Sequence, residues 1–229
     1  MIYISVLQHC NLSTKAAVLL PFNEHYRNKE ALNGSLKVRM SNIEFVSGID
    51  GEPGGAILFK GSQDSYVEIE ADKRIDFGYS LTILSHILPF ESHTGPIVHY
   101  NADQHGVQMW IQGTMEEKGR LSARFNKRNL SYSKWLHVDV INVGTWNFIG
   151  ASYDHMTGEA SLYHDGVQVY STSIGKNIYL ATQYEIRIGA MLLPFLGKYK
   201  GKVACVQFYS KALQRQEVAA ARRACMPGM

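Results

Sequence analysis

Residues 144–169 constrain the fold more than any other part of the chain, because they encode three consecutive strands and the two turns that join them. The first strand, 146–153, is rich in aromatic and apolar residues. A short turn follows it and contains Gly158, which can take the positive φ angle that such hairpin loops need. Asp165-Gly166 is a second, two-residue turn signal of the type I′ kind. The segment therefore predicts three adjacent antiparallel strands within about thirty residues.

Further strand candidates recur along the rest of the chain at spacings of about ten residues, which favours a two-sheet sandwich. We expect strands within residues 16–22, 36–46, 56–60, 66–71, 79–88, 95–100, 107–112, 119–125 and 135–142. The segment 79–88 is apolar or small at nearly every position and predicts a central strand. No repeat or linker divides the 229 residues, so we expect a single domain over 1–229, with 1–15 as a flexible or truncated N-terminal segment.

The composition is that of a folded chain without a strong charge. Apolar residues make up 45% of the sequence and the net charge is +3. A charge this small does not indicate a nucleic-acid partner. No apolar run approaches the ~20 residues that a membrane helix needs. We therefore expect neither nucleic-acid binding nor direct membrane insertion.

Several motifs carry a family resemblance. Residues 144–169 resemble the central signature of laminin-G-like domains, the concanavalin A-like jelly rolls related to pentraxins. The segment 186–190 (IRIGA) is similar to the family's "I-x-I-G" strand, 201–218 to its closing strand and short helix, and 51–69 to its entry strands. The resemblance implies an all-β, two-sheet antiparallel jelly roll with one short C-terminal helix. It is specific for the fold and says much less about function.

The chain has three cysteines, an odd number. In the family a bridge between the positions of Cys205 and Cys225 is common, and the resemblance implies it here. Closing a loop of this size would stabilise the fold by about 3 kcal/mol. Cys10 is then left over, either free or paired with a segment outside this sequence. Three reduced thiols in a cytosolic protein are the alternative.

Asn-x-Ser sequons at Asn11, Asn33 and Asn129 favour a disulfide-bonded protein in an oxidising compartment over a cytosolic protein with reduced thiols. Sequons of this kind are acceptors for N-glycans on surface loops of secreted proteins. We therefore expect a secreted protein, or the extracellular part of a cell-surface protein.

Three carboxylates in one predicted strand are the strongest enzyme signal. Glu68, Glu70 and Asp72 lie at alternate positions and would share one face. Jelly-roll glucanases hydrolyse sugars with strand carboxylates of this general kind, but their pattern places an Asp between two Glu. We expect a solvated strand face and no catalytic residues, with a glycoside hydrolase as the rival.

A calcium ion at the rim is the one cofactor that the resemblance suggests, because many relatives hold one with carboxylate and carbonyl oxygens. The oxygen donors in suitable loops are Asn23, Asp50 and Glu52. The acidic residues that relatives place after the "I-x-I-G" strand and in the closing strand are absent here, since the chain has residues 190–193 (AMLL) and Ala204. None of the nine histidines forms a ligand pair at zinc spacing.

A basic cluster with aromatic neighbours is the main candidate for ligand binding. Six cations fall within seventeen residues, and Arg120 and Arg124 would face the same way on one predicted strand. The residues we expect to contact a ligand are Trp110, Arg120, Arg124, Arg128, Tyr132 and Trp135. They suit a sulfated or sialylated glycan, or an acidic protein partner. An exposed hairpin with ordinary charges is the alternative.

We therefore expect an extracellular, non-catalytic recognition or adhesion module that binds a glycan or a protein through rim loops. A glycoside hydrolase built on Glu68 and Glu70 is the first rival. A structural module of a larger extracellular or receptor protein, with no ligand of its own, is the second.

Overall fold

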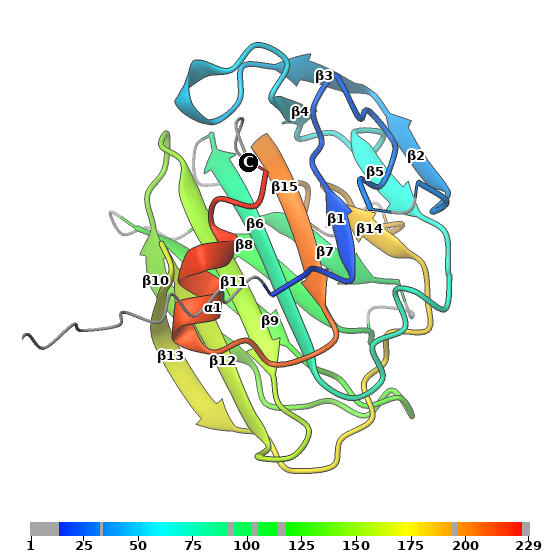
Figure 1. Ribbon diagram of the computed structural model, residues 1–229, viewed down its shortest axis with the longest axis vertical. Coiled ribbons are helices and arrows are strands. Elements are labelled where there is room, and N and C mark those ends of the chain that lie inside the picture. Colours follow the sequence, from blue (N-terminus) through cyan, green and yellow to red (C-terminus); the bar gives the residue numbers. More distant parts are fainter. Residues whose placement is uncertain are drawn as a thin grey trace, which may run out of the picture.

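The computed structural model describes residues 14–32, 34–90, 94–101, 105–113, 118–193 and 197–225. Two antiparallel sheets are stacked face to face, and one short helix lies against the outside of the larger sheet (Figure 1). This is the two-sheet sandwich with a C-terminal helix that the sequence predicts. None of the described helices is long and apolar enough to cross a membrane.

The larger sheet has eight strands in the order β13-β12-β11-β6-β15-β4-β3, with β1 paired to β15. Their bounds are β1 Val18–Leu20, β3 Ile43–Val46, β4 Ala56–Lys60, β6 Leu81–Pro89, β11 Asn147–Tyr153, β12 Glu159–His164, β13 Val167–Ser173 and β15 Lys200–Tyr209. A 3-10 turn, η1 Ile49–Gly51, precedes β4, and the helix α1 Arg215–Ala221 follows β15.

The second sheet has seven strands in the order β10-β9-β8-β7-β14-β5-β2. Their bounds are β2 Val38–Ser41, β5 Tyr66–Ile69, β7 Gly95–Tyr100, β8 Gln108–Gln112, β9 Gly119–Arg124, β10 Leu136–Ile141 and β14 Ile186–Ile188. Every predicted strand is present, although β5 is shorter than expected. Because β5 ends at Ile69, neither Glu70 nor Asp72 lies on the strand with Glu68, and this part of the prediction is wrong.

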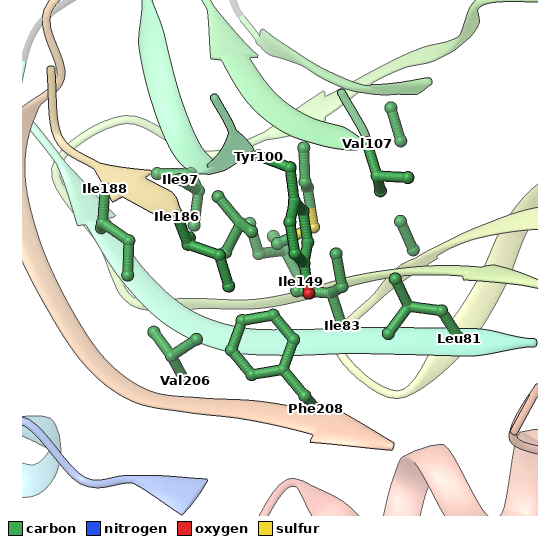
Figure 2. Packing of buried hydrophobic residues seen from close by; sticks show 14 of the residues in the cluster. Leu81, Ile83, Ile97, Tyr100, Val107, Ile149, Ile186, Ile188, Val206 and Phe208 are labelled. Atoms are coloured by element: carbon green, nitrogen blue, oxygen red, sulfur yellow. The ribbon is translucent and has the colours of Figure 1, made fainter. Parts of the chain in front are cut away.

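The core fills the space between the two sheets. Side chains alternate along each strand, so every second residue points inward, and these residues form one continuous buried cluster. Figure 2 shows Tyr100 of the seven-stranded sheet reaching toward Ile83, Ile149 and Phe208 of the other sheet. The hydroxyl of Tyr100 donates a hydrogen bond to the carbonyl of Ile75 at 2.7 Å, so its one polar group is satisfied.

The central hairpins have the predicted geometry. Asp165 and Gly166 have φ angles of 51° and 82°, which is the type I′ requirement of two positive angles. Gly158 has φ +77°, and a Cβ there would lie 2.6 Å from a backbone carbon of Gly175. Glycine is therefore required at this position both by conformation and by space. The resulting strands β11, β12 and β13 are adjacent in the sheet.

The strand β6 is central, as its apolar sequence predicts, and it is buried on both faces. Its inner face joins the core, and Leu84 on its outer face packs with Phe148 and Tyr163 under the C-terminal helix. Val218 of α1 is fully buried against this outer cluster. Burial of a Val side chain stabilises by about 1.5–3 kcal/mol. The helix therefore explains why both faces of this strand are buried.

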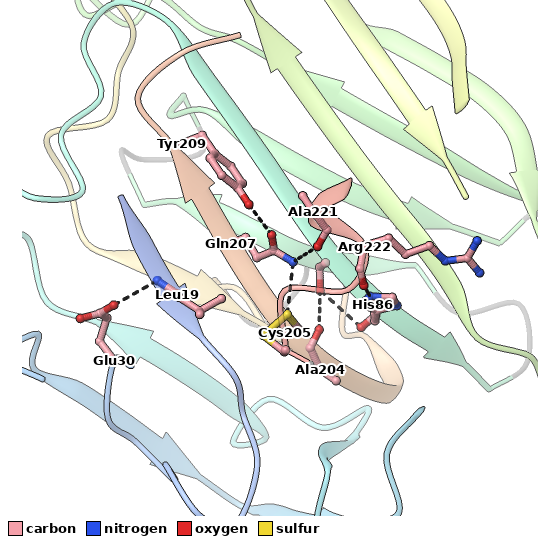
Figure 3. Close-up of a disulfide and its surroundings, with 11 residues drawn as sticks. Leu19, Glu30, His86, Ala204, Cys205, Gln207, Tyr209, Ala221 and Arg222 are labelled. Atoms are coloured by element: carbon pink, nitrogen blue, oxygen red, sulfur yellow. Dashed lines mark hydrogen bonds between the residues drawn. A yellow bond between two sulfur atoms is a disulfide. The ribbon is translucent and has the colours of Figure 1, made fainter. Parts of the chain in front are cut away.

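The predicted disulfide between Cys205 and Cys225 is present, with Cα atoms 5.7 Å apart (Figure 3). It joins β15 to the segment after α1. Next to it, the side-chain amide of Gln207 donates to the carbonyl of Ala221 at 3.1 Å. The ring Nε2 of His86 donates to the carbonyl of Arg222 at 2.8 Å. Cys10 lies outside the described residues.

Replacing Cys205 and Cys225 together with serine is expected to lower the free energy of unfolding by about 3 kcal/mol, because the unfolded chain gains the freedom of a loop of about twenty residues. Urea denaturation of the variant and the wild type measures this difference. Equal unfolding midpoints in the two proteins would contradict the prediction.

Candidate functional site

The outward face of the seven-stranded sheet carries a row of polar side chains, one from each neighbouring strand. The strand register places these residues side by side, in the order Arg39, Glu68, Arg187, His99, Gln108 and Arg124. Their sequence neighbours, such as Val67 and Ala123, point into the core. The row divides into one half that is held by ion pairs and one half that opens into a pocket.

Ion pairs engage the first half of the row. Arg187 contacts Glu68 at 2.7 Å, and its guanidinium lies 3.7 Å from the centre of the Tyr66 ring. Arg39 contacts Glu68 at 3.6 Å and also pairs with Glu70. The two carboxylates of this half are therefore already bound by cations of neighbouring strands.

A jelly-roll glucanase would need one of these carboxyl groups to act as a general acid with a raised pKa. Burial raises the pKa of Glu70, but hydrogen bonds from Arg39 and Lys37 outweigh burial and lower it. Asp72 lies in the turn after β5, where hydrogen bonds from Arg74 hold the pKa of its carboxyl well below its usual range. The arrangement thus favours ionised, cation-bound carboxylates, which is the opposite of what the general acid requires.

The second half of the row forms a pocket of about 240 Å³, which we call the sheet pocket. Its lining residues are His99, Gln108, Trp110, Gln112, Arg124, Tyr132, Trp135 and Met191. Four of them are predicted ligand-binding residues: Trp110, Arg124, Tyr132 and Trp135. No Asp or Glu is among the described lining residues, so the charge of this lining is positive.

Arg124 is the cation of the sheet pocket. Its guanidinium carbon lies 4.9 Å from the ring centre of Tyr132 and 4.5 Å from that of Trp135. Contacts of this kind hold a guanidinium in place through the negative faces of the rings. Burial lowers the pKa of Arg124, and Tyr132 opposes the shift. The buried Nε of Arg124 has no hydrogen-bond partner among the described residues.

Other buried polar atoms around Arg124 also have no hydrogen-bond partner within the described part of the chain. They are both ring nitrogens of His99, the indole Nε1 of Trp110 and the hydroxyl of Ser122. A buried polar group without a partner costs about 1–3 kcal/mol, and each such group in a folded protein calls for an explanation. The five atoms lie on the three adjacent strands β7, β8 and β9, and four of them belong to residues that line the sheet pocket.

His99 is a neutral member of this set. Its side chain is completely buried. Burial lowers the pKa of His99 to about 4, although the neighbouring Gln108 opposes the shift. Near neutral pH the ring therefore offers one donor and one acceptor, a combination that suits a sugar hydroxyl. Sequence reasoning missed His99, Gln108, Gln112 and Met191, because only the strand register brings them beside Arg124.

The remaining cations of the basic cluster do not join the sheet pocket. Arg120 faces the same way as Arg124, as predicted, but it pairs with Asp139 through two hydrogen bonds of 2.6 and 2.9 Å. Arg128 is bound by Asp76, with one hydrogen bond of 3.1 Å. Arg120 and Arg128 therefore do not line the sheet pocket, and carboxylates that lie elsewhere in the sequence neutralise their charges. Their direct role in ligand binding stays a prediction.

The three predicted calcium ligands do come together. Asn23, Asp50 and Glu52 line one small cavity of about 20 Å³ beside the disulfide. The Asn23 amide oxygen already accepts the backbone N–H of Tyr26 at 2.9 Å. Calcium takes six to eight oxygen ligands, and two carboxylates with one engaged amide do not supply them. Among the described residues there is no group of three or more His, Cys, Asp or Glu arranged to hold a metal. Calcium binding stays a prediction.

One predicted glycosylation site lies within the described residues. Asn129 is exposed, and its side-chain oxygen accepts hydrogen bonds from the backbone and hydroxyl of Ser131 at 3.1 and 2.8 Å. The acceptor side chain therefore lies on the surface, as a sequon requires. Asn11 and Asn33 lie outside the described residues.

A protein-family model described as the concanavalin A-like lectin/glucanase superfamily matches residues 60–219, more than two thirds of the chain. The chain belongs to this superfamily. The match covers β5 to β15 and reaches into α1, so it includes every strand that lines the sheet pocket. Members of the superfamily include both lectins and glucanases, as its description states, and membership alone does not choose between binding and catalysis. No curated protein matches the sequence.

Several solved structures are similar to this chain over about half of their own length. The binding domain of botulinum neurotoxin serotype G aligns with a TM-score of 0.69 and 13% identity, over 90% of this chain and 50% of that domain. The serotype D domain, solved with N-acetylneuraminic acid, aligns at 0.70 and 13%, over 91% and 50%. The binding domain of Paraclostridial Mosquitocidal Protein 1 aligns at 0.66 and 15%, over 86% and 49%. The chain thus spans about half of each domain, and the likeness shows the fold alone.

Proposed function

We propose that this protein is a non-catalytic recognition module that binds a glycan carrying an acidic sugar, and that the sheet pocket is its binding site. The observation that carries the proposal is a set of four buried polar atoms of Arg124, His99 and Trp110, which line the sheet pocket and have no hydrogen-bond partner among the described residues. A carboxylate on the sugar would accept hydrogen bonds from the Arg124 guanidinium. Sugar hydroxyls would bond to His99 and to the indole N–H of Trp110.

The aromatic rings add the second element of sugar recognition. Tyr132 and Trp135 are 57% and 44% exposed at the mouth of the pocket, so part of each ring is free to contact a sugar face. The same rings keep Arg124 in place before a ligand arrives. A preorganised site loses little side-chain freedom on binding, which raises affinity.

The comparisons support a binding role over an enzymatic one. The neighbours named above are described as binding domains, and one was solved with N-acetylneuraminic acid, an acidic sugar. The carboxylates that a glucanase would use are bound by Arg39, Lys37, Arg187 and Arg74 in this chain. Recognition of glycans, together with the disulfide and the exposed Asn129 sequon, fits a secreted protein or the extracellular part of a surface protein.

A glycan array, read with the wild-type protein in the presence of calcium and again with a chelator, tests this function. We expect signals on glycans that carry carboxylated sugars and much weaker signals on their neutral counterparts. The described residues that line the sheet pocket include no group of metal ligands, so the same pattern should persist with the chelator. An array that is blank under both conditions would contradict the proposal and favour the structural-module rival.

A further inference from the structure

A second, larger groove lies beyond the sheet pocket, where the loops at one end of the sandwich meet. It has a volume of about 610 Å³ and is lined by residues 127–129 and 176–179. The first segment belongs to the loop between β9 and β10, and the second follows β13. The turn between β11 and β12 and the loop after β13 lie at the lower end of the molecule in Figure 1. We call this feature the loop groove.

The loop groove carries an uncompensated positive charge. Lys127 and Lys176 are both exposed, and neither forms an ion pair within the described part of the chain. Arg128 also lines the groove, but Asp76 neutralises its charge. No Asp or Glu is among the described residues that line the groove. An acidic partner would therefore meet two lysines in a lining whose described residues include no carboxylate.

Exposed aromatic and apolar side chains lie beside these lysines. Tyr79 and Tyr179 are 59% and 52% exposed, and their ring centres are 5.1 Å apart. Met156, which follows His155 in the sequence, is 72% exposed. The ring of His155 lies 5.1 Å from that of Tyr79 and 5.5 Å from that of Tyr179, so the three rings form one cluster. Tyrosine and methionine are enriched at protein interfaces.

The groove is held in its present shape. The backbone N–H of Arg128 donates to the carbonyl of Tyr179 at 2.6 Å, and residues Lys127 and Leu180 form a β-bridge. The ring Nδ1 of His155 donates to the carbonyl of Ile178 at 3.1 Å, which fixes the aromatic cluster to the same loop. A partner would therefore bind without first ordering these loops.

We propose that the loop groove is a docking surface for an acidic protein segment that also carries an aromatic or apolar side chain. The carboxylates of that segment pair with Lys127 and Lys176, and its apolar side chain packs on the rings of Tyr79 and Tyr179. A sulfated glycan would use the two lysines but would leave the apolar surface unused. The combination of features therefore favours a protein partner.

An N-glycan attached to the exposed Asn129 would block this groove. Asn129 lines the groove, and it is the acceptor of an Asn-x-Ser sequon. An N-glycan on Asn129 would occupy the space that the acidic segment needs. Protein with this glycan is expected to bind the segment less tightly than protein without it.

The test uses an immobilised random copolymer of glutamate and tyrosine as the probe, with biolayer interferometry as the readout. Replacing Lys127 and Lys176 together with glutamate should weaken binding about tenfold or more, because two attractive contacts become repulsive. Tyr179→Ala should weaken it about fivefold through the lost ring contact. The matched control replaces Lys15 and Lys29, exposed lysines that line neither pocket, with glutamate, and should change binding less than about twofold.

Three results would overturn the proposal. Equal losses in the groove variant and in the control would mean that net charge alone attracts the probe. Equal binding of polyglutamate and of the mixed copolymer, with no effect of Tyr179→Ala, would show that the aromatic contact does not contribute to binding. Displacement of the probe by heparin, together with unchanged binding in Tyr179→Ala, would assign the groove to polyanionic glycans. None of these results depends on the sheet pocket, which Arg124 variants test separately.

Discussion

Replacing Arg124 with alanine is expected to weaken binding of acidic glycans by about 100-fold, because truncating one partner of a buried, hydrogen-bonded charge pair costs about 2–5 kcal/mol. The variant removes the only cation among the described residues that line the sheet pocket. It also leaves Tyr132 and Trp135 without the guanidinium that lies over their rings. Isothermal titration with an acidic glycan from the array measures the loss directly.

Two further variants separate charge from geometry. Arg124→Lys keeps the positive charge but loses the planar group that stacks on the rings, so we expect an intermediate loss of about tenfold. Arg39→Ala is the matched control. Arg39 projects from the same sheet face as Arg124, but it lies at the opposite end of the polar row, where it pairs with Glu68 and Glu70. This control variant should change binding less than about twofold. Equal affinities of Arg124→Ala and Arg39→Ala would contradict the proposed site.

The protein is expected to lose stability steeply on acidification, because it buries two neutral histidines. Burial lowers the pKa of His86 and of His99 to about 4 each, whereas a histidine in the unfolded chain titrates near 6.5. Between these values the unfolded state binds more protons than the folded state. The stability is therefore full above about pH 6.5 and falls as the pH decreases toward 4, by about 2 kcal/mol per histidine at pH 5.

Urea denaturation at pH 7 and at pH 5 measures this effect. His86→Gln and His99→Gln each replace the ring with a side chain that does not titrate, so each should remove about half of the pH dependence. The exposed His137 serves as the control, and His137→Gln should leave the pH dependence unchanged. An unfolding free energy that is the same at both pH values in the wild-type protein would contradict the prediction.

Local sequence patterns predicted four of the eight described residues that line the sheet pocket. Alternation along 107–112 and 119–125 predicts that Trp110 and Arg124 project from strands, and both line the sheet pocket. The same alternation could not show that Arg120 meets Asp139 or that Arg128 meets Asp76. The second pair is 52 positions apart in sequence, and its contact depends on how the loops pack. The neutralisation of these two charges was therefore beyond prediction from the sequence.

The strands, the type I′ turn at Asp165-Gly166 and the alternation of inward and outward side chains depend on residues that are close together in the chain, so they could be predicted from the sequence. Only the tertiary structure decided which strands became neighbours and in which register. That choice placed the buried His99 opposite Gln108 and Gln108 opposite Arg124, and so created the pocket. Strand order is set by burial of apolar surface between distant segments, and no local pattern encodes it.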